Sequence, residues 1–411
     1  MIVAKFGGTS VATKQNAERI RKIILSKKHC KFVVVSALGK SQAFDKKVTD
    51  MLFEVYYLYS SKQDYLPLLR EVISRYQNLA DELNLKINLQ KQYEEIIFKL
   101  NSKTEGKAYL ISRGEYLSAL IYSKYLNAQF LDAKDFIIFN KKGEINYFET
   151  AKRLKQIPQN KLNVIGGFYG ANCHGKIKLF SRGGSDITGA ILAKIFDAEI
   201  YENYTDVNGV YDKNPKIFKN AKQLPILNYK TAYGMADSGN EIVHKSALNI
   251  LKNTNTVLIV KNTQNNIFGT VLTSADYIFN NLFACKSNIK ILLTKNINKQ
   301  ILNKLKSIGE LKRIIFCNNI FLVIFEQIYV NENYLNSFVG NNNYFDAFLF
   351  TFFSNIKIED NNIKQLNKIK NKLKNISIFC DYLSFKNNFV VIIKKEQFDY
   401  SNGIINKYLQ N

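Results

Sequence analysis

One short segment, KFVVVSA at Lys31–Ala37, constrains the fold of this chain more than any other stretch. Its centre is the β-branched run Val33–Val35, and the segment is apolar on both faces. Both faces should therefore be buried, as in a parallel strand between two layers of helices. Further strands are expected at Ile2–Phe6, Gln129–Asp132 and Leu162–Gly166, with helical segments between them. This alternation predicts an α/β domain built on an open, mostly parallel sheet with helices on both faces.

The character of the chain changes near residues 272–281, where the glycine-rich loops stop. After this point the order strand, helix, strand, strand occurs twice. The expected strands are Ile289–Lys295, Leu311–Cys317, Ile320–Glu326, Phe345–Phe353, Ile376–Leu383 and Asn388–Lys395, and the expected helices are Lys299–Ile308 and Ile363–Leu373. This order predicts two small α+β modules of one kind, with helices on one face of an antiparallel sheet. A length of 411 residues suits two or three domains.

The net charge of +24 raises the question of nucleic-acid binding. Lysine, asparagine and isoleucine are, however, overused along the whole chain. The longest basic stretch, Lys364–Lys374, spaces its lysines through an apolar helical pattern, which is typical of a solvated helix face. The sequence contains no zinc-finger or RNA-recognition signature. We therefore expect no nucleic-acid partner, although a basic surface attracts polyanions such as nucleotides.

Membrane insertion, secretion and a protein-bound metal site are also unexpected. No apolar run approaches the roughly 20 residues that a membrane span requires, and the N-terminus MIVAKFGGTS lacks the pattern of a signal peptide. The five cysteines are scattered without a CxxC, and the three histidines lie well apart in the sequence. A cytoplasmic protein with reduced thiols is the simplest interpretation.

A first glycine loop, Gly7-Gly8, lies between the first expected strand and a helical segment that begins at Val11. Glycines let the backbone approach an anion closely, and a following helix offers unpaired N–H groups and the positive end of its dipole. Lys5, at the strand end, adds a cation that can reach phosphates. The alternative is a tight turn with a solvated lysine. The P-loop order and the GxGxxG fingerprint are both absent.

A second glycine loop, SRGGSD at Ser181–Asp186, precedes an expected apolar helix at Ile187–Phe196. Ser185 or Asp186 is suited to cap this helix, which is a purely structural role. The functional alternative is that Asp186 positions a lysine or a metal ion at phosphates. Two anion-binding loops on one sheet would suit a substrate with several phosphates and a charged co-substrate.

Two further stretches carry polar residues with two possible roles. Glu115 is expected in the first turn of a helix that continues through Tyr116–Leu126, where it either favours the helix dipole or binds a substrate ammonium group. Thr205 and Asp206 precede the turn Asn208-Gly209, so they either form the turn or hydrogen-bond a nucleotide.

Several motifs in sequence order together resemble the aspartokinases of the amino-acid kinase superfamily. The motifs are KFGGTSVA, VSALGK with KVTDML, SRGEYLSAL, GGFYG, SRGGSDITGAILAK and YTDVNGVYDKNPK. The tail after Cys285 resembles the tandem ACT domains that aspartokinases carry. The resemblance implies an amino-acid kinase domain over residues 1–275, followed by ferredoxin-like ACT modules over residues 285–340 and 341–411.

The resemblance implies that ATP and L-aspartate give ADP and 4-phospho-L-aspartate, the first step toward lysine, threonine and methionine. A side-chain carboxylate is already an adequate nucleophile, so no general base is required. The site then needs to position the reactants and neutralise charge, with Mg²⁺ at the phosphates.

The resemblance also implies a role for each matched residue. Lys5 would stabilise the transferring phosphoryl group, and Asp186 would orient Lys5. Arg182 would hold the aspartate α-carboxylate and Glu115 its ammonium group. The implied substrate-binding residues are Ser36, Thr49, Glu115 and Arg182. The implied nucleotide-binding residues are Lys5, Gly7, Gly8, Ser185, Thr205, Asp206, Tyr211 and Lys216.

The sequence departs from the family pattern in three places. Lys216 stands where many members have arginine, and Asn240-Glu241 stands where many have Ala-Lys. The Pro-Gly-containing ligand loop of ACT domains is not recognisable near Thr294–Lys299. The resemblance still implies a homodimer and a lysine or threonine effector at the ACT region.

Two other functions remain open on the sequence. One is a kinase of the same fold acting on glutamate, carbamate or UMP, and Glu115 with Arg182 favours an amino-acid head over the last two. The other is a catalytically silent regulatory subunit that only binds amino acids. The presence of Lys5, Arg182 and Asp186 argues against this second alternative.

Overall fold

The computed structural model describes two compact units of the chain. It covers residues 1–158, 160–180, 183–212, 215, 221–237, 242–265 and 267–274, and beyond these 282–294, 303, 305, 307, 309–317, 320–328, 344–353, 377–383 and 388–394. The first unit comprises Met1–Val210, Gln223–Tyr233 and Ile242–Ala275, and the second comprises Tyr211–Lys222, Gly234–Glu241 and Asp276–Asn411.

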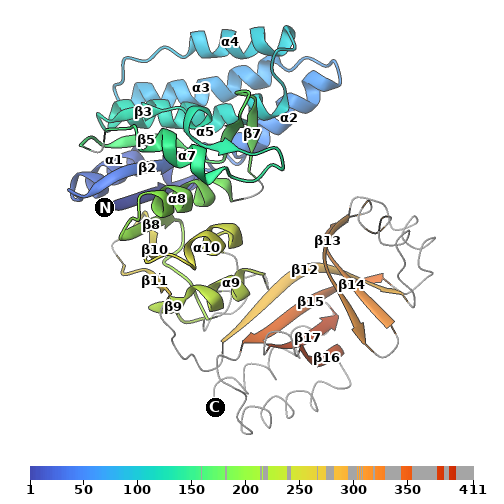
Figure 1. Ribbon diagram of the computed structural model, residues 1–411. Coiled ribbons are helices and arrows are strands. Elements are labelled where there is room, and N and C mark those ends of the chain that lie inside the picture. The colour runs from blue at the N-terminus through green and yellow to red at the C-terminus, as the bar shows by residue number, and fades with distance from the viewer. Residues whose placement is uncertain are drawn as a thin grey trace. The chain divides into compact units, whose positions relative to one another are not determined.

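The first unit is built on an eight-stranded sheet with strand order β3-β5-β2-β1-β8-β10-β11-β9 (Figure 1). Six neighbouring strands are parallel: β3 (Gln129–Leu131), β5 (Asn163–Gly166), β2 (Cys30–Val35), β1 (Ile2–Phe6), β8 (Ile200–Thr205) and β10 (Val257–Asn262). The last two strands of the order, β11 (Thr270–Thr273) and β9 (Ile226–Asn228), run in the opposite direction. The predicted open, mostly parallel sheet is therefore confirmed.

Helices cover both faces of this sheet. The helices in this part of the chain are η1 (Thr9–Val11), α1 (Lys14–Leu25), α2 (Val48–Ser60), α3 (Leu66–Glu82), α4 (Gln90–Asn101), α5 (Lys107–Tyr125), α6 (Ala133–Phe136), α7 (Tyr147–Leu154), α8 (Gly184–Ile195), α9 (Tyr229–Asp237) and α10 (Lys245–Leu251). Helices α2 and α3 pack on α5, and α4 packs on α3. A small sheet of β4 (Ile138–Phe139), β6 (Tyr169–Asn172) and β7 (Ile177–Leu179) lies beside them.

Side chains of the central strands alternate between the two helical layers. On β1 and β8, Lys5 and Asn203 contact Asp186 of α8. Glu202, the residue before Asn203 on β8, instead pairs with Lys27, which follows α1. This alternation explains why the central strands are apolar on both faces, since each face packs against a helix.

Helix α5 begins at Lys107, nine residues before the predicted helix Tyr116–Leu126. It spans Lys107–Tyr125, so Glu115 lies in its middle and not in a first turn that could favour the dipole. The helix is buried nearly all round, which hides the periodicity that marks a surface helix. It also passes through Gly114, where a Cβ atom would lie 2.8 Å from the side chain of Ala37. The glycine therefore serves close packing and does not end the helix.

Neither glycine loop leads into its helix as predicted. Gly183, with φ of +74°, is the N-cap of α8, so Ser185 and Asp186 lie in the first turn and neither caps the helix. The amide groups of Asp186 and Ile187 both donate to the carbonyl of Gly183, which fixes this start. After Gly8 the chain forms the short 3₁₀ helix η1, and α1 begins only at Lys14.

The second unit contains a six-stranded antiparallel sheet. Its strands are β12 (Leu282–Thr294), β13 (Gly309–Cys317), β14 (Ile320–Ile328), β15 (Tyr344–Phe353), β16 (Ser377–Leu383) and β17 (Asn388–Lys394), in the order β13-β14-β12-β15-β17-β16. Each predicted module supplies three strands in the same internal order, and the two join through their first strands, β12 and β15. The predicted helix Ile363–Leu373 lies outside the described residues. Of the predicted helix Lys299–Ile308 only residues 303, 305 and 307 are described, and each of them is helical.

A buried ion cluster ties α1 to the sheet. The Glu202 carboxylate accepts hydrogen bonds from Lys27 at 2.9 Å, from Lys261 at 2.7 Å and from the Tyr204 hydroxyl at 3.1 Å. Burial raises the pKa of Glu202, but the hydrogen bonds from the two lysines outweigh burial and hold the pKa below its usual value. The stabilisation is therefore present above the unfolded pKa, near 4.5, and is lost as pH falls through the folded pKa.

Glu202→Gln should lower the free energy of unfolding at pH 7 by about 2 kcal/mol, because both lysines lose their counter-charge. The loss stays below that of a fully buried pair since both lysine side chains are partly exposed. The difference from wild type should shrink as the pH drops below about 4.5. Urea denaturation at pH 7 and pH 4 measures both effects, and an equal loss at the two pH values would contradict this account.

Among the residues that the structure describes, no helix is both long enough and apolar enough to cross a membrane.

Candidate functional site

The candidate site lies at the strand of the main sheet from which the chain adds further strands on both sides. Strand β1 has β2 on one side and β8 on the other, so the chain builds the sheet outward from β1 in both directions. Ligands of open α/β sheets bind outside the carboxyl ends of the strands at such a switch point. Lys5 lies near the carboxyl end of β1, which places its side chain at this position.

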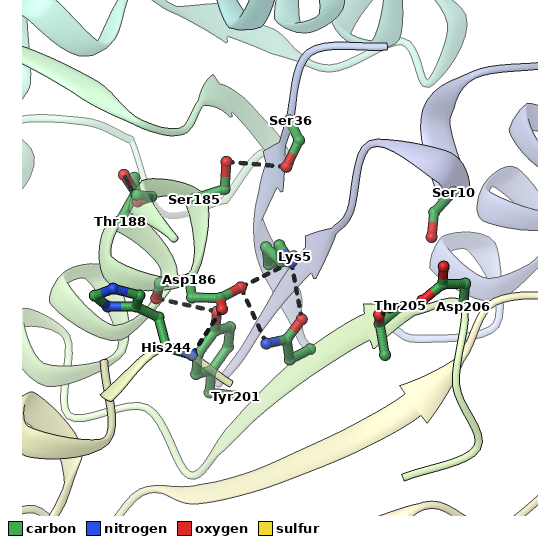
Figure 2. Close-up of polar contacts among 12 residues, drawn as sticks. Lys5, Ser10, Ser36, Ser185, Asp186, Thr188, Tyr201, Thr205, Asp206 and His244 are labelled. Carbon is green, nitrogen blue, oxygen red and sulfur yellow. Dashed lines mark hydrogen bonds and ion pairs between the residues drawn. The ribbon is translucent and has the colours of Figure 1, made fainter. Parts of the chain in front are cut away.

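A buried cation and a buried carboxylate form the centre of the site (Figure 2). The Lys5 ammonium group is 2.7 Å from Asp186 Oδ1, and both residues are 8% exposed. Asp186 Oδ2 accepts the main-chain N–H of His244 at 3.1 Å. The Tyr201 hydroxyl donates to the Asp186 carbonyl at 3.2 Å. Asp186 therefore holds the Lys5 ammonium group in one place and is itself held from two other elements.

Asn203 completes this centre and was not identified from the sequence. Its side-chain oxygen accepts from Lys5 at 3.1 Å, and its Nδ2 donates to Asp186 at 3.1 Å. Asn203 is directly opposite Lys5 in the parallel pairing of β1 with β8. The one sign of its role in the sequence is a polar amide side chain within a strand that is otherwise largely buried. The pairing partner of that strand could not be known from the sequence.

The first glycine loop and the loop after β2 contact each other through their backbones. The Gly39 N–H donates to the Gly8 carbonyl at 2.9 Å, and a Cβ atom on Gly39 would lie 2.5 Å from Gly8 C. The Gly7 N–H donates to the Tyr204 carbonyl at 3.0 Å. This amide therefore extends the strand ladder, which differs from the expectation that it binds phosphate. The expected role of the Gly8 amide stays a prediction.

Gly39→Ala should separate these two loops and lower kcat/KM by about 10²-fold, because small displacements of reacting groups cost that much. The added methyl group would meet the backbone of Gly8 and Thr9, which cannot rotate away. Gly106→Ala is the matched control, since a Cβ atom there meets nothing within 4 Å. Equal activities of the two variants in a steady-state assay would contradict the prediction.

Two serines join the second glycine loop to the loop after β2. The Ser36 hydroxyl donates to the Ser185 hydroxyl at 2.9 Å (Figure 2). Ser185 is in the first turn of α8, one residue before Asp186. The family resemblance implies a substrate-side role for Ser36 and a nucleotide-side role for Ser185, and the structure brings the two side chains into contact.

Glu115 is a buried carboxyl group with an unsatisfied oxygen. It is 4% exposed, and its Oε2 has no hydrogen-bond partner within the described part of the chain. Burial raises the pKa of Glu115 to about 8, although the main-chain N–H groups of Ala37 and Glu115 and the charge of Arg113 oppose the shift. An unsatisfied carboxyl oxygen in such a place is suited to a cationic ligand.

The predicted nucleotide residues at the end of β8 are fixed by the turn after β10. The Thr205 hydroxyl donates to Asp206 at 3.1 Å, and the Thr205 carbonyl accepts the Thr263 N–H at 3.0 Å. Thr263 also shares a 2.6 Å hydrogen bond with Ser10, just past the first glycine loop. Figure 2 shows Ser10, Thr205 and Asp206 on one side of Lys5 and the Ser36–Ser185 pair on the other.

Four predicted residues are not joined to this centre by the described contacts. Thr49 is half-buried in the first turn of α2, and no described hydrogen bond links its side chain to the others. Tyr211 belongs to the second unit. Arg182 and Lys216 lie outside the described residues, as do Asn240 and Glu241. The roles expected of all these residues stay predictions.

Comparison with known sequences places the chain in a family. The sequence model of the amino acid kinase family matches residues 1–262, which is more than half of the chain. The chain belongs to the amino acid kinase family. The match covers every residue of the centre described above, so the buried lysine and aspartate are part of an amino acid kinase domain.

The predicted resemblance to aspartokinases is confirmed by curated relatives. Aspartokinase 3 of Bacillus subtilis is 32% identical over 281 residues, which is 64% of this amino acid kinase and 62% of the relative. The aspartokinase of Rickettsia felis is 26% identical over 359 residues, 83% of this chain and 76% of the relative. The chain spans about 60% of the length of the first curated relatives that it matches.

Solved structures share the fold. The aspartate kinase of Clostridium acetobutylicum aligns over the whole of both chains with a TM-score of 0.83 at 24% identity. Aspartokinase III of Escherichia coli, solved in complex with aspartate and ADP, aligns with a TM-score of 0.78 at 19% identity. Together with the family match, these alignments confirm the amino acid kinase fold that the sequence predicts.

Proposed function

We propose that this amino acid kinase transfers the γ-phosphoryl group of ATP to the side-chain carboxylate of L-aspartate, giving 4-phospho-L-aspartate and ADP. The observation that carries the proposal is the position of the buried Lys5–Asp186 pair at the strand switch point, next to the loop whose Ala37 N–H faces Glu115. The aspartokinase relatives, and the Escherichia coli enzyme with aspartate and ADP, support the choice of substrate.

On this proposal the enzyme accelerates the reaction by positioning the two reactants and by neutralising the charge of the transferring phosphoryl group. The β-carboxylate of aspartate attacks the γ-phosphorus, and the bond from that phosphorus to the bridging oxygen of ADP breaks. Lys5 faces the phosphoryl oxygens, where its fixed charge stabilises the charge of the transition state without reorganisation. Asp186 and Asn203 keep the ammonium group in that place. Glu115 would pair with the substrate ammonium group through its free Oε2, and Arg182 with the α-carboxylate.

Mg²⁺ is compatible with this set of residues. Among the described residues no group of three or more His, Cys, Asp or Glu could hold a metal ion. Mg²⁺ commonly uses one or two protein carboxylates together with substrate phosphates and water. Asp186 is the carboxylate that would contribute here. The ion would neutralise phosphate charge when bound.

The second unit is proposed to be regulatory. We expect ACT-like modules at residues 285–340 and 341–411 after a catalytic domain at 1–275, a homodimer, and lysine or threonine as effector. The repeated strand order of the two halves supports this division. Escherichia coli aspartokinase III has been solved in complex with lysine and aspartate. Titrating activity with lysine, threonine and both, and measuring the mass in solution, tests these expectations.

The function is tested by incubating the purified protein with ATP, Mg²⁺ and L-aspartate in hydroxylamine and measuring aspartyl hydroxamate. We expect product with aspartate and little with glutamate, carbamate or UMP in the corresponding assays. Preference for one of those acceptors would reassign the substrate. A signal no higher than that of Lys5→Ala would refute the kinase assignment.

A further inference from the structure

The loop between β2 and α2 carries the substrate side of the proposed site. This segment, residues 36–47, begins with Ser36, which contacts Ser185, and with Ala37, whose N–H faces the Glu115 carboxylate. The same loop contacts the first glycine loop through Gly39. Its conformation therefore decides where the groups that meet aspartate lie relative to those that meet phosphate.

Two adjacent residues of α3, Arg75 and Tyr76, contact the 36–47 loop. Arg75 Nη2 donates to the Gly39 carbonyl at 2.9 Å, and Arg75 Nη1 donates to the Lys46 carbonyl at 2.9 Å. The guanidinium group also lies over the Phe44 ring, 4.2 Å from its centroid. A single planar side chain thus holds the loop at three positions, Gly39, Phe44 and Lys46.

The next residue, Tyr76, joins the loop to α5. Its hydroxyl accepts the Leu38 N–H at 3.3 Å and donates to the Gly114 carbonyl at 2.8 Å. Gly114 immediately precedes Glu115, so one hydroxyl group sets the distance between the loop and the helix that carries the proposed ammonium ligand. Figure 1 shows α3 alongside α2 and α5, on the side away from the sheet.

The burial of the Arg75 guanidinium group is energetically unfavourable, which argues against a merely structural role. Arg75 is 4% exposed. Within the described part of the chain no carboxylate lies within salt-bridge distance of it, and Glu71, one turn earlier on α3, attracts its charge only at longer range. Burying a cation without a counter-charge is unfavourable, and an apolar side chain of similar size would fill the space at lower cost. The carbonyl groups of the 36–47 loop are the contacts that only a forked donor can make.

We infer that Arg75 and Tyr76 are positioning residues that hold the 36–47 loop in the conformation required to bind the amino-acid substrate. The inference rests on the proposed function, because it assigns the loop to the aspartate side. It predicts that loss of either contact weakens aspartate binding much more than ATP binding, since Thr205 at the end of β8 is fixed by Thr263 and not by the loop.

Tyr76→Phe and Arg75→Met test the inference. Each should raise the KM for aspartate by about tenfold or more and change the KM for ATP by less than about twofold. The melting temperature of Arg75→Met should fall little compared with the rise in its KM for aspartate, because the substitution removes a buried charge. Arg75→Lys should not rescue binding, since an ammonium group cannot reach both carbonyls.

Tyr229→Phe is the matched control. Tyr229 is also buried, and its hydroxyl likewise donates to a carbonyl, that of Thr256 at 2.7 Å, and accepts an N–H, that of Leu258 at 3.1 Å. Its loss should affect stability and leave the KM for aspartate unchanged. An increase equal to that of Tyr76→Phe would overturn the inference, because it would mark a general effect of destabilisation.

Hydrogen exchange gives a readout that does not depend on activity. The amides of Leu38 and Gly39 should exchange faster in Tyr76→Phe and Arg75→Met than in wild type, and not in Tyr229→Phe. Unchanged exchange in both variants overturns the inference even if the wild-type protein proves inactive toward aspartate. Faster exchange with an unchanged KM for aspartate overturns it as well. Absence of hydroxamate from the wild type refutes the proposed function alone.

Discussion

Lys5→Met should lower kcat for aspartate phosphorylation by about 10²–10³-fold, as the loss of a preorganised group at developing charge does in other enzymes. Methionine keeps most of the volume of the side chain and removes the charge that lies 2.7 Å from Asp186. The KM values for ATP and aspartate should change much less than kcat, because the interaction strengthens in the transition state. Steady-state hydroxamate assays at saturating substrates measure the effect.

Lys27→Met is the control for this variant. Lys27 also pairs with a buried carboxylate, that of Glu202 at 2.9 Å, but it does so on the face of the sheet opposite α8. Its loss should leave kcat within about twofold of wild type. Comparable losses of kcat in the two variants would mean that Lys5 acts through stability and not at the reacting phosphate. Thermal unfolding of both proteins shows whether each remains folded.

Glu115→Gln should raise the KM for aspartate by about 10²-fold and abolish its dependence on pH, because a neutral amide cannot pair with the substrate ammonium group. In the wild type the pKa of Glu115 is about 8 owing to burial, so the carboxyl group is mostly neutral at pH 6. Binding then requires loss of this proton. The KM for aspartate should fall by up to about tenfold per unit as the pH rises from 6 toward 8.

The raised pKa of Glu115 also predicts how the stability of the protein depends on pH. The folded pKa of Glu115, about 8, lies above its usual value of 4.5, so its contribution to stability is full below pH 4.5 and is lost as the pH rises toward 8. The slope from this group alone is at most about 1.4 kcal/mol per pH unit. Glu115→Gln should remove that slope in urea denaturation between pH 5 and 8.

Glu202→Gln separates a local effect of Glu115 from a general effect of losing a buried carboxylate. Glu202 is buried like Glu115 but lies in the ion cluster with Lys27 and Lys261. This variant should lose stability and keep the wild-type pH dependence of the KM for aspartate. A pH-independent KM in the wild type would contradict the role of Glu115.

Strands β1, β2, β3 and β5 of the main sheet were predicted with their ranges, whereas β9, β10 and β11 were not. A strand that is apolar on both faces can be accommodated only between two layers, and Lys31–Ala37 therefore indicates a parallel sheet before any contact is known. The helix boundaries were harder. Helix α5 is buried on all sides, and Gly114 within it packs against Ala37, so neither periodicity nor glycine marked its true start.

In the second unit, local pattern gave the strands but not their assembly. Five of the six strands lie close to the predicted bounds, whereas β12 begins at Leu282, seven residues before the predicted start at Ile289. The joining of the two halves through β12 and β15 was not foreseen. Strand pairing between segments far apart in the chain depends on side-chain contacts across the sheet, and a single sequence does not record them.

The chain's own residue order determined the sheet type, the two glycine loops and the presence of Lys5, Glu115 and Asp186 among the candidate residues. Only the tertiary structure decided that Asn203 bridges Lys5 and Asp186, and that Arg75 and Tyr76 hold the 36–47 loop. The physical reason is that strand and turn signals are local. The contacts that fix a site join segments that are distant along the chain, and packing alone brings them together.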